Sequence, residues 1–322
     1  MARFTLGNPL RPILLAAGRS AWVERLVTRL PLTRSVVTRF VPGADRASVV
    51  ATVRRLLASG RMISVDHLGE DITTREQAQA TADAYLALLD DFAGLPVEPL
   101  GGCRRLEVSI KLSALGQSLP GDGEALALEH ALAICRAADA VGCWVNVDAE
   151  DHTTTDSTLR IVGQLREEFP DVATVLQAYL HRTEQDCRDL SGPRSRIRLC
   201  KGAYAEPADV AFQSPAEVNA SYLRCLEILM RGEGYPMAAT HDPAMVEGAQ
   251  RIAAETGRSL DRFEIQMLYG IRDAEQSRLV EAGFRLRTYV PFGDDWFGYF
   301  MRRLAERPAN LVFFLRSLFG KR

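Results

Sequence analysis

The stretch Phe284-Arg-Leu-Arg-Thr-Tyr-Val-Pro-Phe-Gly-Asp-Asp-Trp-Phe-Gly-Tyr-Phe-Met-Arg-Arg-Leu-Ala-Glu306 joins a short β-like segment to a helix. The β-like segment covers residues 284–290, and we expect it to end at Pro291 and Gly293, because both residue types interrupt regular structure. The aspartate pair that follows is a helix cap signal. A strand followed directly by a helix is the repeating unit of a parallel sheet, so this stretch predicts one βα unit.

The same order of strand and helix recurs upstream, in units of roughly 25 to 35 residues. The expected strands are 62–67, 105–112, 143–149, 172–178, 196–201, 237–241 and 262–267, and the helices that follow them are 73–92, 123–140, 157–169, 184–190, 215–231, 243–256 and 273–282. Together with residues 284–306 these make eight βα units. Eight units in about 250 residues favour an α/β fold, a closed (β/α)8 barrel of the TIM type. An open doubly wound sheet is the alternative.

The chain ahead of the barrel has a different composition. Residues 1–40 contain seven arginines and one acidic residue, Glu24, with apolar positions between them. We expect residues 1–60 to form an N-terminal basic helical arm and residues 61–322 to form the barrel. A basic amphipathic segment can lie on an anionic membrane surface or pack on its own domain, and both interpretations stay open.

Bulk composition excludes several classes of function. The net charge of −2 argues against a nucleic-acid partner. The six cysteines are scattered, with neither a C-x-x-C pair nor zinc spacing, so we expect reduced thiols in a cytoplasmic protein. No apolar run of about 18 residues and no cleavable signal peptide is visible. We therefore expect a cytoplasmic protein, with peripheral attachment to the inner face of the cell membrane as a hypothesis for the arm.

Polar residues gather where the expected strands end. In chain order they are Asp66, His67 and Glu70; Ser109, Lys111 and Ser113; Asp148, Glu150 and Asp151; Gln177 and Tyr179; Arg198, Lys201 and Tyr204; Thr240, His241 and Asp242; Gln266 and Tyr269; and Tyr289. In a (β/α)8 barrel the carboxyl ends of the strands meet at one face, where functional groups lie. The sequence therefore predicts a polar pocket at that face.

A cationic helix face borders this pocket. Tyr299, Arg302, Arg303 and Glu306 are spaced i, i+3, i+4 and i+7, so they lie along one face of the last helix. Arginine binds carboxylates through a planar fork. The cations Lys111, Arg198, Lys201, Arg302 and Arg303 exceed what one small carboxylate needs, so we expect a phosphate-bearing cofactor as well as an acidic substrate.

Other kinds of chemistry have weaker support in the sequence. The acidic and histidine residues near Asp148 and His241 could bind a metal ion, but nearby lysine and arginine side chains would repel it. We therefore expect no metal site. No Gly-x-Ser-x-Gly turn and no Gly-x-Gly-x-x-Gly loop after a strand occurs, which argues against a serine hydrolase and a Rossmann dinucleotide site. A Schiff-base lyase using Lys111 or Lys201 stays open. A barrel that only binds an amino acid is a third possibility.

Short motifs at the strand ends resemble those of a known family. They are Val65-Asp-His-Leu-Gly-Glu70, Ser109-Ile-Lys-Leu-Ser-Ala-Leu115, Val147-Asp-Ala-Glu150, Gln177-Ala-Tyr179, Arg198-Leu-Cys-Lys-Gly-Ala-Tyr204, Ala239-Thr-His-Asp242, Glu264-Ile-Gln-Met-Leu-Tyr-Gly270 and the closing Tyr-x-Pro-x-Gly…Tyr-x-x-Arg-Arg-x-x-Glu. From residue 62 to the last helix, the chain resembles the proline dehydrogenases, and the basic arm is similar to that of the short bacterial monofunctional members.

The resemblance implies an activity, a cofactor and partners. It implies FAD-dependent oxidation of L-proline to Δ1-pyrroline-5-carboxylate, by hydride transfer from proline C5 to flavin N5, as the first step of proline catabolism to glutamate. The electrons would pass to a membrane quinone. We expect the next step to be carried out by a separate pyrroline-5-carboxylate dehydrogenase.

The resemblance also implies roles for individual residues. Arg198, Lys111, Tyr289 and Asp148 would be catalytic, with Asp148 bonded to Tyr289. Substrate would be bound by Lys111, Leu268, Tyr289, Tyr299, Arg302 and Arg303, with Glu70 paired to Arg302. FAD would be bound by Gln177, Arg198, Lys201, Gly202, Ala203, Tyr204, Thr240, His241, Gln266 and Glu306.

Overall fold

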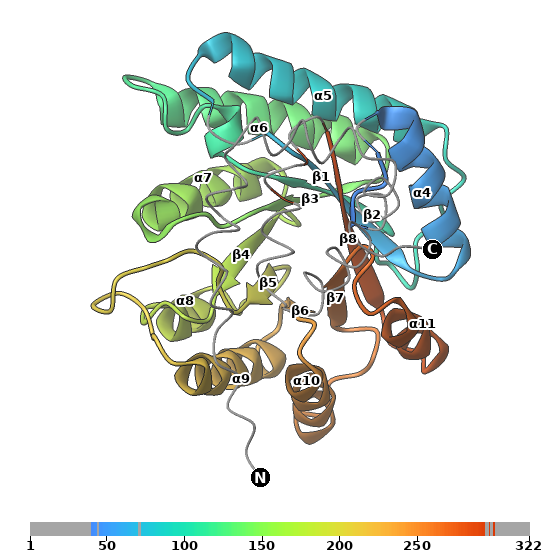
Figure 1. The fold of residues 1–322 in the computed structure, drawn as a ribbon, viewed down its shortest axis with the longest axis vertical. Coiled ribbons are helices and arrows are strands. Elements are labelled where there is room, and N and C mark those ends of the chain that lie inside the picture. The colour runs from blue at the N-terminus through green and yellow to red at the C-terminus, as the bar shows by residue number, and fades with distance from the viewer. Residues whose placement is uncertain (1–39, 44, 70–71, 294–295, 297–298, 300–322) are drawn as a thin grey trace, which may run out of the picture.

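Parallel β-strands close into a barrel in which each strand pairs with the next along the chain and β8 pairs with β1. This computed structural model describes residues 40–43, 45–69, 72–293, 296 and 299. Figure 1 shows the strands at the centre and the helices around them. The predicted closed (β/α)8 barrel is confirmed, and the open sheet is excluded.

Strands and helices alternate along the described chain. The strands are β1 (Met62–His67), β2 (Leu106–Ile110), β3 (Trp144–Val147), β4 (Ala173–Gln177), β5 (Arg196–Cys200), β6 (Tyr235–Ala239), β7 (Glu264–Leu268) and β8 (Leu286–Phe292). The helices are α4 (Arg46–Ala58), α5 (Arg75–Ala93), α6 (Gly123–Ala140), α7 (Thr155–Glu168), α8 (Thr183–Asp189), α9 (Pro215–Arg231), α10 (Pro243–Glu255) and α11 (Asp273–Glu281). Two 3-10 turns, η1 (Ser113–Leu115) and η2 (His152–Thr154), follow β2 and β3.

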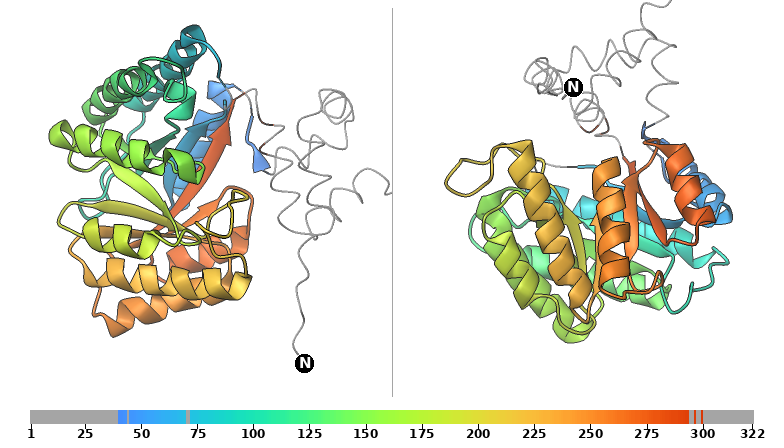
Figure 2. Two further views of the ribbon diagram at one scale, coloured as in Figure 1. Left: turned by 90° about the vertical axis from the view of Figure 1, so that its left-hand side faces the viewer. Right: turned by 90° about the horizontal axis from the view of Figure 1, so that it is seen from below.

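Local sequence signals set where helices begin. Helices α5 and α9 each start at a capping box, Thr74 with Gln77 and Ser214 with Glu217, in which each side chain bonds the other residue's backbone N–H. Pro215 occupies the first position of α9, where a missing N–H costs nothing. Figure 2 shows α9 and α10 side by side on the outer surface.

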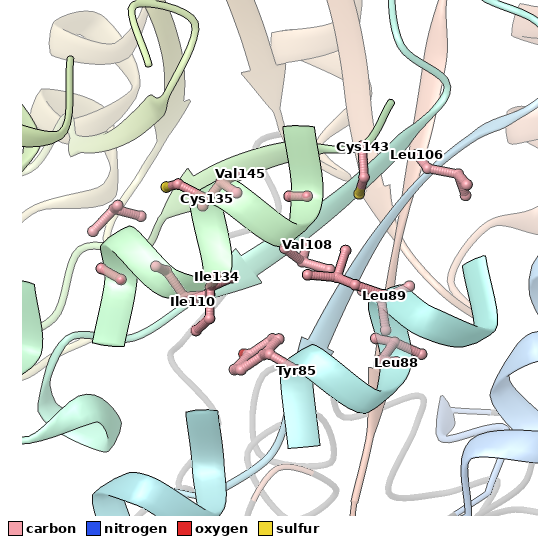
Figure 3. Packing of buried hydrophobic residues seen from close by; sticks show 14 of the residues in the cluster. Tyr85, Leu88, Leu89, Leu106, Val108, Ile110, Ile134, Cys135, Cys143 and Val145 are labelled. Atoms are coloured by element: carbon pink, nitrogen blue, oxygen red, sulfur yellow. The ribbon is translucent and has the colours of Figure 1, made fainter. Parts of the chain in front are cut away.

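The apolar core lies between the barrel wall and the helices. On β2, Leu106, Val108 and Ile110 belong to the core cluster, while Glu107 and Ser109 bond to Arg198 inside the barrel. Successive side chains of a strand point to opposite faces, so one strand supplies both the core and the interior. In Figure 3 this apolar layer is formed by β2 and β3 against helices α5 and α6.

The predicted end of the last strand is wrong. We expected the segment 284–290 to end at Pro291 and Gly293, but the strand continues through Pro291 to Phe292, directly before Gly293, and pairs with β1 up to His67. Tyr289 O accepts from the N–H of Tyr269, the residue after β7, and Phe292 O accepts from the Leu68 N–H, so position 291 faces the β7 side. Strand β7 has already ended at Leu268, and the missing N–H of Pro291 therefore interrupts no pair.

Helix α4 is the described part of the predicted arm. Its Val49, Val53 and Leu56 are buried in the core, where α4 packs against β1 and β8. Residues 1–39, which carry the arginine-rich segment, lie outside the described residues. Within the part of the chain that the structure describes, no helix is both long and apolar enough to cross a membrane.

Candidate active site

A cavity of about 650 Å³ lies at the carboxyl ends of the strands. Every described residue to which the resemblance assigned a catalytic, substrate or cofactor role lines this cavity: Lys111, Asp148, Gln177, Arg198, Lys201, Gly202, Ala203, Tyr204, Thr240, His241, Gln266, Leu268, Tyr289 and Tyr299. Of the other polar residues predicted at the strand ends, Asp66 and Asp242 line it too, and the described residues that do not are His67, Ser109, Ser113, Glu150, Asp151, Tyr179 and Tyr269. The remaining predicted site residues, Glu70, Arg302, Arg303 and Glu306, lie outside the described residues.

Arg198 forms the charged floor of the cavity. Its guanidinium donates from all three nitrogens: Nε to Gln266 at 2.5 Å, Nη1 to Asp148 and Ser109 at 2.8 Å each, and Nη2 to Glu107 at 2.7 Å and Ser64 at 3.1 Å. Only 5% of the residue is exposed. Burial alone would lower the pKa of Arg198, but Asp148 and Glu107 outweigh burial and raise it, so this cation is fixed in place.

Asp148 joins two cavity residues, Arg198 and Tyr289, to the buried Asn146. Its carboxylate accepts from Arg198, from the Tyr289 hydroxyl at 2.9 Å and from the Asn146 amide at 2.9 Å. Burial, with the adjacent carboxylates, raises the pKa of Tyr289 well above its usual value. Tyr289 is therefore a neutral hydrogen-bond donor to Asp148.

Lys111 is bound by a buried carboxylate. Its Nζ donates to both oxygens of Asp66, at 2.7 and 2.8 Å, and lies 3.9 Å from Asp148. Burial raises the pKa of Asp66; Lys111 opposes this shift, and Asp148 adds to it. The pair places the Lys111 ammonium at the edge of the cavity, with its charge balanced by the Asp66 carboxylate.

The loop after β5 forms one wall of the cavity. Lys201 Nζ is 2.7 Å from Asp242, which also caps α10. Gly202 has φ +112°, and a Cβ added there would lie 2.3 Å from the Tyr179 ring. Glycine is required at this position both by the backbone conformation and by the close ring.

We expect Gly202→Ala to destabilise this loop. The left-handed backbone of residue 202 and the clash with Tyr179 would displace the wall, at a cost of about 1–3 kcal/mol. Urea unfolding measures the loss of stability. Gly192→Ala is a matched control, because an added Cβ there would meet nothing within 4 Å. Equal stability of Gly202→Ala and wild type would contradict this reading of the loop.

The other polar residues of the cavity also have structural partners. His241 Nε2 accepts from the Leu268 N–H at 2.8 Å, which fixes the tautomer of its ring. Gln177 donates to the Glu150 carbonyl at 2.7 Å. Gln266 lines the cavity, but its amide nitrogen donates to Glu264, so it joins Arg198 to the layer below.

Sequence reasoning missed this lower layer. Glu107, Arg196, Glu264 and Arg287 are buried inside the barrel and paired with one another, Glu107 with Arg196 at 2.6 Å and Glu264 with Arg287 at 2.7 Å. Burial alone would raise the pKa of Glu107, but Arg287, Arg196 and Arg198 together lower it to about 2. A sequence signal existed: each of these residues stands two positions before a predicted polar residue of its strand.

A second cavity of about 260 Å³ contains none of the predicted site residues. It lies near the start of β3, where Trp144 forms part of its lining. Its charged residues pair locally, Arg104 with Asp139 and Arg194 with Asp171. Among the described residues no group of three or more histidine, cysteine, aspartate or glutamate side chains could hold a metal ion.

A closed (β/α)8 barrel with a charged cavity at the carboxyl ends of its strands defines the class of this protein as a barrel enzyme. The family model described as proline dehydrogenase matches residues 49–316. Proline dehydrogenase 2 of Bacillus subtilis (strain 168) is 36% identical over 97% of this chain and 99% of its own length. Proline dehydrogenase of Deinococcus radiodurans is 37% identical over 88% of this chain and 90% of its own length.

The solved structures agree on the fold. Proline utilization A (PutA) from Bdellovibrio bacteriovorus superposes with a TM-score of 0.81 at 20% identity, covering 98% of this chain and 38% of that one. The bifunctional protein PutA of Escherichia coli (strain K12) is 27% identical over 85% of this chain and 23% of its own length. This chain belongs to the proline dehydrogenase family and is an enzyme of that family. Its length matches the short members rather than PutA.

Proposed function

We propose that this chain oxidises L-proline to Δ1-pyrroline-5-carboxylate with FAD as its cofactor, the first step of proline catabolism. Family membership supports the proline dehydrogenase activity. The observation that carries the proposal is the cavity: residues from Lys111 to Tyr299, far apart in the sequence and assigned to substrate and cofactor, line one space.

The cavity suits a flavin nucleotide. Its volume of about 650 Å³ is within the range of small-molecule sites. The cationic side chains of the cavity would attract the phosphates of FAD, and its amide and hydroxyl groups would offer hydrogen bonds to the flavin and adenine rings. The residues that would hold FAD are Gln177, Arg198, Lys201, Gly202, Ala203, Tyr204, Thr240, His241 and Gln266, with Glu306 beyond the described residues. When bound, FAD supplies the two-electron acceptor that side chains lack.

Proline would be held by charge at one end and by rings at the other. We assign its carboxylate to Lys111, Arg302 and Arg303, with Glu70 paired to Arg302. Leu268, Tyr289 and Tyr299 line the cavity and would contact the pyrrolidine ring. The bond from Tyr289 to Asp148 fixes the orientation of one of these rings.

We assign an orienting role to Asp148. Its Oδ1 receives hydrogen bonds from Arg198, Ser109 and Asn146, and its Oδ2 receives one from Tyr289. Hydrogen bonds to both oxygens hold this carboxylate in one orientation. The chain's contribution is therefore preorganised charge and orientation.

We expect Tyr289→Phe to lower kcat/KM for proline by about ten-fold, the effect of losing one hydrogen bond to a charged group. The ring remains to contact proline, but the bond to Asp148 that orients it is lost. Steady-state kinetics with an artificial electron acceptor measure the change. Tyr269→Phe is the control, because that hydroxyl bonds Arg55. An unchanged kcat/KM in Tyr289→Phe would remove Tyr289 from the substrate site.

We expect Arg303→Lys to raise the apparent KM for proline by about ten-fold while flavin content stays unchanged, because a point charge cannot replace a bidentate fork. Titration with proline under anaerobic conditions measures the apparent affinity. Wild-type affinity in Arg303→Lys would show that the carboxylate is bound elsewhere.

The test of the proposed function is an absorption spectrum of the purified protein before and after anaerobic L-proline. Flavin bands that bleach on addition of proline would establish cofactor and substrate together. A flavin that does not respond to proline would show that the substrate is another compound. A colourless protein that takes up no added FAD would contradict the proposal.

The Schiff-base alternative has little structural support. Lys111 donates to both oxygens of Asp66, and Lys201 pairs with Asp242 at 2.7 Å. Each amine is held by a carboxylate, and a lysine that forms a Schiff base would have to leave that partner to attack a carbonyl. Trapping with borohydride and a keto acid would label a lyase and leave this protein unlabelled.

We assign reoxidation of the flavin to a membrane quinone, and the next oxidation to a separate pyrroline-5-carboxylate dehydrogenase. The protein would be cytoplasmic, with the arginine-rich arm on the inner face of the cell membrane. Liposome pelleting of the full chain and of a chain lacking residues 1–40 tests this attachment. Equal pelleting of the two would contradict it.

A further inference from the structure

Glu206 lies between the loops that follow β3, β4 and β5. Its side chain is 4% exposed. Oε1 accepts from the His152 N–H at 2.9 Å and from the Tyr179 hydroxyl at 3.3 Å, and Oε2 contacts His152 Nδ1. Burial, with the Glu206 carboxylate, raises the pKa of Tyr179, so Tyr179 stays a neutral donor. A buried carboxylate with these partners fixes the three loops relative to one another.

The loop that Glu206 holds is the wall of the cavity. Lys201, Gly202, Ala203 and Tyr204 all line the cavity, whereas Glu206 does not. Gly202 lies against the ring of Tyr179, whose hydroxyl bonds Glu206. The side chain of Glu206 therefore helps to position residues 201–204 from the side of the loop that faces away from the cavity.

The rest of this loop is attached independently. Phe212 N donates to the Tyr179 carbonyl at 2.8 Å, and His181 N donates to the Val210 carbonyl at 2.9 Å. The ring of Phe212 also lies against that of His181, with centroids 4.4 Å apart. Loss of the Glu206 carboxylate would therefore loosen the half of the loop that faces the cavity, where the bond from Tyr179 N to the Lys201 carbonyl at 2.9 Å remains, and leave the other half in place.

We propose that Glu206 is a positioning residue for cofactor binding: through His152 and Tyr179 it holds residues 201–204 in the arrangement that retains FAD. This role rests on the proposed function. Glu206 touches neither the cavity nor the reacting atoms, and its effect is on affinity for the cofactor rather than on the chemical step.

The test compares Glu206→Ala, Glu206→Gln and wild type as holoenzymes. Each is diluted, and the fluorescence of released FAD gives the dissociation constant. We expect Glu206→Ala to raise that constant by about ten-fold, the effect of losing hydrogen bonds to a buried charged group. Glu206→Gln should recover part of the loss, because its amide oxygen still accepts from His152 N. At saturating FAD, kcat and the KM for proline should stay at wild-type values.

Two controls separate positioning from general stability. Glu247→Ala removes an exposed carboxylate of α10 and should leave FAD affinity unchanged. In a double-mutant cycle, Glu206→Ala and His152→Ala should be non-additive, whereas Glu206→Ala and Glu247→Ala should add. Wild-type FAD affinity in Glu206→Ala, or a loss of kcat without a loss of affinity, would overturn the proposal.

Hydrogen exchange distinguishes failure of this role from failure of the proposed function. Amides of residues 201–206 should exchange faster in Glu206→Ala than in wild type, while those of residues 210–213 should not change. If wild-type protein takes up no FAD, the cofactor assignment fails and this role fails with it. Unchanged exchange in a protein that binds FAD would instead reject the role of Glu206 alone.

Discussion

Arg198→Lys is expected to reduce the rate of flavin reduction by proline by about 100-fold or more, the scale of effect that misplacement by about 1 Å produces at a reacting centre. Arginine at this position bonds five acceptors at once, among them the carboxylate of Asp148 and the buried carboxylate of Glu107. Lysine has fewer donors and no planar fork. It would leave one carboxylate without its partner and shift Asp148, which orients Tyr289.

The same substitution should also destabilise the fold. Breaking a buried ion pair by changing one partner costs about 3–5 kcal/mol. Stopped-flow reduction and urea unfolding measure the two effects separately. Arg136→Lys is the matched control, because Arg136 pairs with Glu168 on the surface, where the two side chains are 59% and 47% exposed. A wild-type rate of flavin reduction in Arg198→Lys would contradict the assignment of Arg198 to the site.

Arg287→Met is expected to destabilise the protein by about 3–5 kcal/mol while leaving the KM for proline unchanged. Arg287 and Glu264 are both fully buried and joined by two bonds, at 2.7 and 3.1 Å. Methionine fills much of the volume but leaves the Glu264 carboxylate buried without its cation. The effect on substrate is small because the pair lies in the layer below the cavity and neither residue lines it.

A second variant tests whether the cost comes from the unpaired charge. Glu264→Gln combined with Arg287→Met removes both charges, and the double variant should regain stability relative to Arg287→Met alone. Unfolding by urea measures all the variants. Additive losses from the two substitutions would show that packing, and not charge, sets the cost at this position.

The architecture of the barrel could be predicted because its signals are local. A run of apolar residues bounded by turn signals marks a strand, and caps such as Thr74 with Gln77 mark where a helix starts. Repetition of these signals eight times leaves few ways to arrange a parallel sheet. The end of β8 could not be predicted in this way. Whether Pro291 interrupts a strand depends on where its neighbour β7 ends, which is not a local property.

The sequence also located the cavity residues, but not what holds them. Polar residues at strand ends converge in any (β/α)8 barrel, so Lys111, Arg198 and Tyr289 could be assigned to one face. Apart from the bond of Tyr289 to Asp148, which the resemblance implied, their partners could not be assigned. The bond of Lys111 to Asp66 and the bond of Arg198 to Glu107 each join residues that come from different strands. Glu206 belongs to no motif that the sequence reveals. Its side chain is buried only because three loops close around it.

By itself, the sequence determined the order of strands and helices and the polar residues at the strand ends, because spacing along the chain fixes both, and it favoured a closed barrel over an open sheet. Only the tertiary structure decided which charges pair. Glu107, with Arg196 and Arg198, and Glu264, with Arg287, form buried networks inside the barrel. A buried charge is tolerated only beside its partner, and that partner is brought close by closure of the barrel rather than by the chain between them.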